Sequence, residues 1–179
     1  MVYIIKISYD GIKDKLPEYL KGYFDAAMVA QLDWFGENIF DRMLTVDVLE
    51  QLSQIIDFQK DERSFSDLKL VFSTTFLGYK MAQFERITCL NKLATKCHVS
   101  LYTDKSNDEL IGVDVIGSVN YENDMPKVFN RSKVNMNFTI RNIRSGIPLR
   151  VWDVLGAGGF LLTNFQAELP SLFENGKHI

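Results

Sequence analysis

Two arginines and a glycine turn stand directly before a predicted helix, and these residue types are suited to holding an anion. Arg141 and Arg144 follow an apolar, strand-like run. Ser145 and Gly146 are typical of a turn, and the next helix opens near Pro148. The first turn of a helix has free backbone N–H groups and the positive end of the helix dipole, so it can bind an anion. Since arginine adds bidentate hydrogen bonds to phosphate oxygens, this segment predicts a phosphate-binding turn.

An acidic side chain follows on the same predicted helix. Asp153 lies one turn after Arg150, close enough to pair with it. A carboxylate beside a phosphate site is unfavourable by repulsion unless it accepts hydrogen bonds from ribose hydroxyls. The same two side chains could equally form a surface ion pair of little energetic value. Spacing alone leaves both interpretations open.

Two other glycine-containing segments lie near predicted strand ends. Gly78 and Lys80 fall in a predicted strand-to-helix loop over residues 74–80, where a glycine would allow close approach of the backbone to a ligand. Lys80 could meet a phosphate or simply be solvated, and the glycine spacing fits neither a Walker nor a dinucleotide motif. The glycines of residues 156–159 are typical of a tight helix-to-strand turn.

Composition and motifs argue against several function classes. A net charge of -3 over 179 residues argues against a nucleic-acid partner, which needs concentrated Lys and Arg. His98 and His178 are far apart without a ligand cluster, and no Asp-x-Asp pair is present, so we expect no metal and no cofactor. No serine–histidine–aspartate arrangement can be assembled.

The same features suggest where the protein resides. No run of about 18 apolar residues is present to span a bilayer, and the N-terminus lacks the apolar block of a signal peptide. Cys89 and Cys97 are predicted to be buried thiols in a reducing compartment, with a disulfide as the alternative. We therefore expect a cytoplasmic protein.

The elements that must position these residues divide the chain in two. Residues 1–66 are predicted to form a short N-terminal strand, over residues 1–10, and a helical connector over 16–59, in which Thr45 caps a helix. Residues 67–179 alternate between the two types of element. Strands are expected at 68–74, 98–102, 113–119, 134–140 and 160–163, and helices at 80–94, 126–132, 149–157 and 168–173.

This alternation predicts an α/β domain, a Rossmann-like parallel sheet covered by helices. In such a sheet the ligand lies beyond the carboxyl ends of the strands, which indicates the loops at 74–80, 139–149 and 163–168. The chain ends where another strand is expected to begin, so we expect a fragment that is incomplete at its C-terminus.

Several short motifs from about residue 70 onward resemble a known family. They are 84–87 (FERI), 99–103 (VSLYT), 116–121 (IGSVNY), 125–129 (MPKVF), 132–137 (SKVNMN) and, above all, 146–164 (GIPLRVWDVLGAGGFLLTN). This part of the chain resembles the carboxyl-terminal domain of glycosyltransferases of the spore-maturation-protein type, relatives of the retaining group with the two-domain GT-B fold.

The resemblance implies a nucleotide-diphosphate-sugar donor held by this domain and an acceptor held by a separate N-terminal domain. Two glutamates separated by seven residues face the donor in the wider group, and Asp153 matches the one on the ribose, whereas Ser145 stands at the sugar-side position. Gly78 and Lys80 resemble the phosphate-facing loop. We therefore expect donor recognition without catalysis by this chain alone. The alternative is a non-catalytic α/β interaction module with a helical docking surface.

Overall fold

The computed structural model describes residues 8–34, 36–56, 58, 66–105, 107–143, 145–177 and 179. It divides into two compact units. The first, called here the helical unit, comprises Met1–Phe84 with Ile140–Asn142, and the second, the α/β unit, comprises Glu85–Thr139 with Ile143–Ile179. The domain boundary predicted between residues 66 and 67 stays a prediction.

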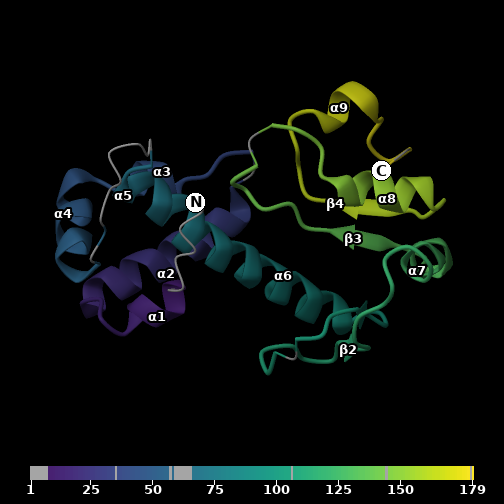
Figure 1. Ribbon diagram of the computed structural model, residues 1–179, viewed down its shortest axis with the longest axis horizontal. Helices are drawn as coiled ribbons and strands as arrows, with labels where there is room; N and C mark the ends of the chain where they lie inside the picture. The colour runs from purple at the N-terminus through teal and green to yellow at the C-terminus, as the bar shows by residue number, and fades with distance from the viewer. Residues whose placement is uncertain are drawn as a thin grey trace. The chain divides into compact units, whose positions relative to one another are not determined.

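The regular secondary structure in the described part of the helical unit is helical. In chain order the helices are α1 (Tyr9–Lys13), α2 (Glu18–Asp33), α3 (Phe40–Met43), α4 (Val46–Ile55), α5 (Leu68–Val71), the π-helix η1 (Phe72–Leu77) and the start of α6 (Gly78–Ala94) (Figure 1). The helical pattern expected over residues 16–59 is confirmed for α2, α3 and α4. Thr45 caps α4 as predicted, because its side chain accepts a hydrogen bond from the N–H of Val48.

Aromatic packing holds the helical unit together. The ring of Phe24 is fully buried, and its centroid lies 5.4 Å from that of Phe72 and 6.3 Å from that of Tyr9. Phe72 also stacks on Phe76, with centroids 5.4 Å apart. Burying side chains of this size contributes about 1.5–3 kcal/mol each, so this cluster supplies a large share of the stability of the unit.

Two predictions for this region are wrong. The segment predicted as a strand at residues 68–74 and the loop predicted at 74–80 are helical, as α5, η1 and the start of α6. A short apolar run fits a strand or a buried helix equally well. This segment forms a helix rather than a strand for two reasons. The side chain of Asp67 caps the helix by accepting from the N–H of Leu70, and the helical spacing turns Phe72 and Phe76 toward the core together.

The N-terminal strand predicted over residues 1–10 lies mostly outside the described residues. Its described end is helical, since α1 begins at Tyr9. Ser8 caps this helix by accepting from the N–H of Gly11. No helix among the described residues is long and apolar enough to cross a membrane.

The α/β unit contains the alternating elements expected from the sequence, although its strands are shorter than predicted. After α6 come β1 (Ser100–Leu101), β2 (Asp114–Val115), α7 (Met125–Arg131), β3 (Asn135–Asn137), α8 (Leu149–Gly156), β4 (Leu161–Thr163) and α9 (Leu169–Leu172). The predicted strands and helices from residue 98 onward are therefore confirmed in order and type.

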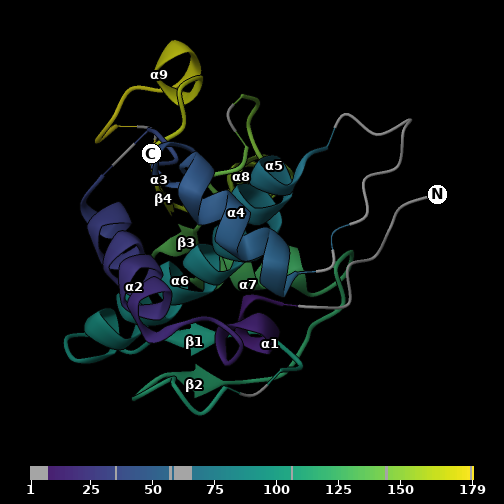
Figure 2. The same ribbon diagram turned by 90° about the vertical axis from the view of Figure 1, so that its left-hand side faces the viewer.

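The described strands form two parallel pairs. β1 lies beside β2, with Ser100 opposite Asp114 (Figure 2). β3 pairs with β4, with Asn135 opposite Leu161 and Asn137 opposite Thr163. The architecture is thus mixed helical and α/β with small parallel sheets, whereas the complete Rossmann-like sheet of the GT-B fold stays a prediction.

A small apolar cluster holds β3, α8 and β4 together. α8 lies beside both strands (Figure 1), and it buries Val151 and Val154 against Leu161 of β4 and Leu169 of α9. Phe129 of α7 packs against the same cluster. This β–α–β arrangement positions the segment that the sequence singled out.

The two cysteines are free thiols. The prediction that both are buried is wrong for Cys97, which is exposed after the end of α6, whereas Cys89 is half-buried. Burial is the main reason why the pKa of the Cys89 thiol is raised, and the carboxylate of Glu85 adds to the effect.

Candidate functional site

A buried polar network marks the carboxyl ends of β3 and β4, where a parallel sheet usually binds its ligand. The amide of Asn137 donates to the hydroxyl oxygens of Thr139 and Thr163, both at 2.9 Å. Asn164 bonds the backbone of Thr139 twice, accepting from its N–H at 2.9 Å and donating to its carbonyl at 2.8 Å. These bonds fix the point at which the chain leaves β3 for the predicted phosphate-binding turn.

The turn before α8 has a backbone donor at Gly146. Gly146 has a φ of 90°, a conformation that favours glycine, and its N–H donates to Oε1 of Glu168 at 2.9 Å. Ser145 is exposed, and α8 begins after Pro148 without a side-chain cap. A carboxylate therefore already binds one N–H of this turn. Arg144 lies outside the described residues.

Arg150 and Asp153 lie on one face of α8, as their spacing predicts. Nη1 of Arg150 lies 3.9 Å from Oδ2 of Asp153, and 27% of the Asp153 side chain is exposed. Arg150 is also held from α7, since its guanidinium carbon lies 5.4 Å from the ring centroid of Phe129 and its Nη1 donates to the sulfur of Met125. The Asp153 carboxylate is thus accessible and has a fixed cation beside it.

Tyr121 adds a hydroxyl to this acidic group. Its side chain is exposed and bonds Asp153, and this hydrogen bond is the largest of the causes that raise the pKa of the Tyr121 phenol. Partial desolvation and the negative charge of Asp153 act in the same direction, whereas Arg150 opposes them. At neutral pH the phenol therefore stays protonated and acts as a donor to the carboxylate.

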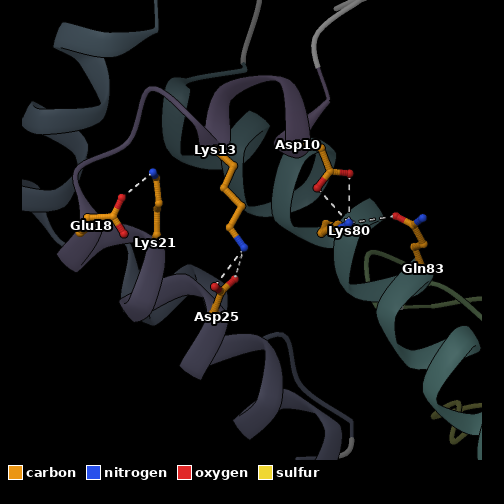
Figure 3. A network of polar contacts seen from close by, with 7 residues as sticks. All are labelled: Asp10, Lys13, Glu18, Lys21, Asp25, Lys80 and Gln83. Carbon is orange, nitrogen blue, oxygen red and sulfur yellow. Dashed lines mark hydrogen bonds and ion pairs between the residues drawn. The ribbon is translucent and has the colours of Figure 1, made fainter. Parts of the chain in front are cut away.

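The other predicted site residues belong to the helical unit. Gly78 and Lys80 lie on α6 rather than in a loop, and Nζ of Lys80 lies 2.9 Å from a carboxylate oxygen of Asp10 and 3.3 Å from Oε1 of Gln83 (Figure 3). A Cβ at Gly78 would lie 2.5 Å from Oδ1 of Asn142, so close packing explains this glycine without a ligand.

Arg141 is likewise engaged in the helical unit. Its Nη1 donates to the carbonyl of Trp34 at 2.6 Å, and its neighbour Asn142 donates to the carbonyl of Thr74 at 2.6 Å. The structure therefore brings Ser145, Gly146, Arg150 and Asp153 into one unit, whereas Gly78, Lys80 and Arg141 fall in the other. Donor binding by all of these residues stays a prediction.

Sequence reasoning missed the residues that support this site. Asn135 and Asn137 of β3 and Thr139 just after it are buried, whereas Val134 before the strand is exposed, so the buried face of this segment is the polar one. The signal was present, because polar residues that recur at every second position of a strand share one face. Glu168 had no comparable signal, since it meets Gly146 across 22 positions.

Metal-binding side chains do not gather within the described part of the chain. No group of three or more His, Cys, Asp or Glu side chains in residues 8–177 that the structure describes could hold a metal ion. His98 and Asp114 form an isolated exposed pair at 2.7 Å beside β1 and β2. The expectation that the protein uses no metal and no cofactor stays a prediction.

Comparison with known proteins gives the family. A family model described as glycosyl transferase-like matches residues 84–179, which is more than half of the chain and coincides with the start of the α/β unit at Glu85. Searches of curated proteins and of solved structures found no significant match. Sugar transfer in general is the activity that this family suggests. The chain therefore belongs to the glycosyl transferase-like family.

Proposed function

We propose that the α/β unit binds the nucleotide-diphosphate-sugar donor of a glycosyltransferase. The observation that carries the proposal is the unit β3–turn–α8, in which the turn at Gly146 is followed by an accessible carboxylate, Asp153, in the second turn of α8, all within the family-matched region. A diphosphate and the ribose next to it need this combination of groups.

The turn at Ser145 and Gly146 is proposed to hold the diphosphate. Negative charge grows on the diphosphate as the glycosidic bond breaks, so donors fixed at that position would stabilise the transition state. Glu168 already accepts from the Gly146 N–H at 2.9 Å, so a diphosphate would have to displace this carboxylate to bind there. Arg144 would add charge. Arg141 contributes less to the proposal, since its Nη1 already donates to the Trp34 carbonyl.

Asp153 is proposed to hold the ribose. An ionised carboxylate only accepts hydrogen bonds, so it suits a pair of neighbouring hydroxyl groups. The guanidinium of Arg150, 3.9 Å away, and the phenol of Tyr121 lie beside this carboxylate and would help to orient it. Gly78 and Lys80 remain predicted donor contacts, but their positions on α6 add no support.

The rest of the reaction is left to other parts of the protein. As the resemblance implies, a separate N-terminal domain would hold the acceptor, and this chain alone would not complete the transfer. A GT-B arrangement, a donor in the cytoplasm and the spore-maturation-protein type belong to the same proposal. No catalytic base is assigned to any residue of the chain.

A thermal-shift series tests the proposal. Uridine, guanosine and thymidine diphosphates are added in turn, and at a concentration 100 times the Kd one of them stabilises the protein by about 2.7 kcal/mol, a rise of about 5 °C or more in Tm. Asp153→Ala abolishes the rise, and Arg144→Ala reduces it. Asp108→Ala, which removes an exposed carboxylate of the same unit, keeps it. No rise with any nucleotide would refute donor binding and favour the interaction module.

A further inference from the structure

Arg150 is held by two side chains of α7. Its guanidinium carbon lies 5.4 Å from the ring centroid of Phe129, within the range of a cation–π contact. Its Nη1 also donates to the sulfur of Met125. Met125 and Phe129 stand one helical turn apart and therefore share a face of α7. The far end of the Arg150 side chain is thus attached to a neighbouring helix rather than free in solvent.

The attached guanidinium is the cation nearest to Asp153 in the described structure. Nη1 of Arg150 lies 3.9 Å from Oδ2 of Asp153, and both side chains are partly exposed. An unattached arginine at such a surface samples many rotamers and gives a carboxylate little direction. Stacking on an aromatic ring restricts the planar guanidinium, and less freedom is then lost when it bonds a carboxylate. Arg150 therefore links the ring of Phe129 to the carboxylate of Asp153.

We propose that Phe129 is a positioning residue, which fixes the Asp153 carboxylate for the ribose hydroxyls by holding Arg150 between the two. This inference rests on the proposed function of Asp153. It assigns Arg150 a role on the carboxylate rather than on the diphosphate. Correct placement of a binding group affects the contacts that depend on its direction more than the contacts made elsewhere on the same ligand. The ribose contact should therefore weaken selectively when Phe129 loses its ring.

The test compares two phenylalanines that pack against the same apolar cluster. Phe129→Leu keeps an apolar side chain but removes the ring beneath Arg150, and Phe173→Leu is the control, because the ring of Phe173 lies 5.7 Å from that of Trp152 instead. The readout is the ratio of the Kd of 2′-deoxyuridine diphosphate to that of uridine diphosphate, with the matching guanosine pair measured as well.

Phe129→Leu is expected to reduce this ratio by about two- to fivefold, which corresponds to the strength of an exposed cation–π contact. Phe173→Leu leaves the ratio unchanged. If Phe129→Leu weakens both nucleotides equally and keeps the ratio, Phe129 has only a structural role and the inference is overturned. Replacing Phe129 with pentafluorophenylalanine keeps the ring and removes its negative face, so it gives the same test if the leucine variant does not fold.

A double-mutant cycle shows whether Phe129 acts through Arg150. Arg150→Met should reduce the ratio at least as much as Phe129→Leu does. The double variant should show the ratio of Arg150→Met alone, because the ring has nothing left to hold. A further reduction in the double variant would mean that Phe129 acts by another route, which contradicts the inference.

A measurement without ligand separates this inference from the proposed function. The ¹⁵N heteronuclear NOE of the Arg150 Nε–H, assigned with Arg150→Lys, reports whether the guanidinium is ordered on the picosecond to nanosecond timescale. We expect order in the unmodified protein and in Phe173→Leu, and mobility in Phe129→Leu. If no diphosphate binds the unmodified protein, the proposed function fails and this measurement alone decides: an Arg150 that stays equally ordered in Phe129→Leu overturns the positioning role.

Discussion

The two compact units use their buried space differently. In the described part of the helical unit the core is built mainly from large apolar side chains, with Phe24, Phe40 and Phe72 fully buried, although Gln31 is fully buried there too and accepts from the N–H of Ile39. In the α/β unit the buried apolar cluster is small, and the amide and hydroxyl groups of Asn137 and Thr139 are buried beside it. Apolar packing needs little direction, whereas a buried polar group must be bonded in a defined geometry.

The ion pairs of the helical unit also differ from the polar contacts of the α/β unit, because they lie at the surface. Lys80 with Asp10, Lys13 with Asp25 and Lys21 with Glu18 are pairs with exposed members at its surface (Figure 3). Such pairs contribute little to stability. The α/β unit instead fixes its polar groups next to the strand ends. Directed polar groups are what a ligand requires, so this arrangement is consistent with the proposal that the α/β unit binds the donor.

Removing the central ring of the helical core should have the largest effect on stability. Phe24→Ala is expected to lower the free energy of unfolding by about 3–5 kcal/mol, because it deletes a fully buried ring and leaves a cavity. Tyr19→Ala, on the same helix but 59% exposed, should change it by no more than about 0.5 kcal/mol. Urea unfolding followed by circular dichroism measures both. A loss of less than about 1 kcal/mol for Phe24→Ala would contradict the claim that aromatic packing stabilises the helical unit.

The polar network of the α/β unit should give the next largest effect. Asn137→Ala leaves the hydroxyl oxygens of the buried Thr139 and the half-buried Thr163 without their donor, and we expect a loss of about 1–3 kcal/mol in the free energy of unfolding. The exposed Asn123→Ala is the matched control and should be neutral. Equal stability of the two variants in urea would show that the network does not hold the strand ends.

A third prediction concerns a buried polar group in the helical unit. Burial raises the pKa of the Tyr9 phenol, and the charges of Asp25 and Asp10 add to this effect. The unfolded chain therefore loses this proton at a lower pH than the folded protein, so stability falls as the pH rises above about 10. The expected loss is about 1.4 kcal/mol per pH unit from this residue.

Tyr9→Phe should remove this alkaline loss. The Tyr9 hydroxyl is buried and has no hydrogen-bond partner among the described residues, so the variant is expected to be near neutral at pH 7. Urea unfolding at about pH 9 and pH 11 measures the difference, with the exposed Tyr19→Phe as control. The same alkaline slope in Tyr9→Phe and in the unmodified protein would contradict the assignment.

The smallest effect is expected for a surface ion pair. Lys80→Met breaks the contact with Asp10 and should cost at most about 1 kcal/mol, less at high salt. Lys15→Met, at an exposed lysine of the same unit, is the control. A salt-independent loss larger than that for Asn137→Ala would contradict the view that this contact is a weak surface ion pair.

Much of the fold of the α/β unit could be predicted from the sequence. The apolar spacing of residues 149–157 and the glycines that follow specify a helix, a tight turn and a strand, because each signal agrees with the next. The apolar run at 68–74 had no such agreement, since its length suits a strand or a helix. The glycine at position 78 then suggested a loop. In the structure a glycine is needed there because the side chain of Asn142 packs closely against it.

The candidate site could be predicted only in part. Helical spacing alone places Arg150 near Asp153, and the structure confirms this proximity. Contacts between distant positions, such as Gly146 with Glu168 or Arg150 with Phe129, depend on how elements pack and leave no local pattern. Arg141 is the clearest example of a contact that the sequence could not predict, since its hydrogen bond to the Trp34 carbonyl joins residues 107 positions apart.

Amide chemical-shift mapping tests the central claim most directly. Uridine, guanosine and thymidine diphosphates are each titrated into the ¹⁵N-labelled protein, and the resonances of the two units are compared. Recognition by the α/β unit predicts saturable shifts at Gly146, Val151 and Asp153, with Phe24 and Leu52 of the helical core unchanged. Shifts confined to the helical unit, or none with any of the three nucleotides, would contradict the account.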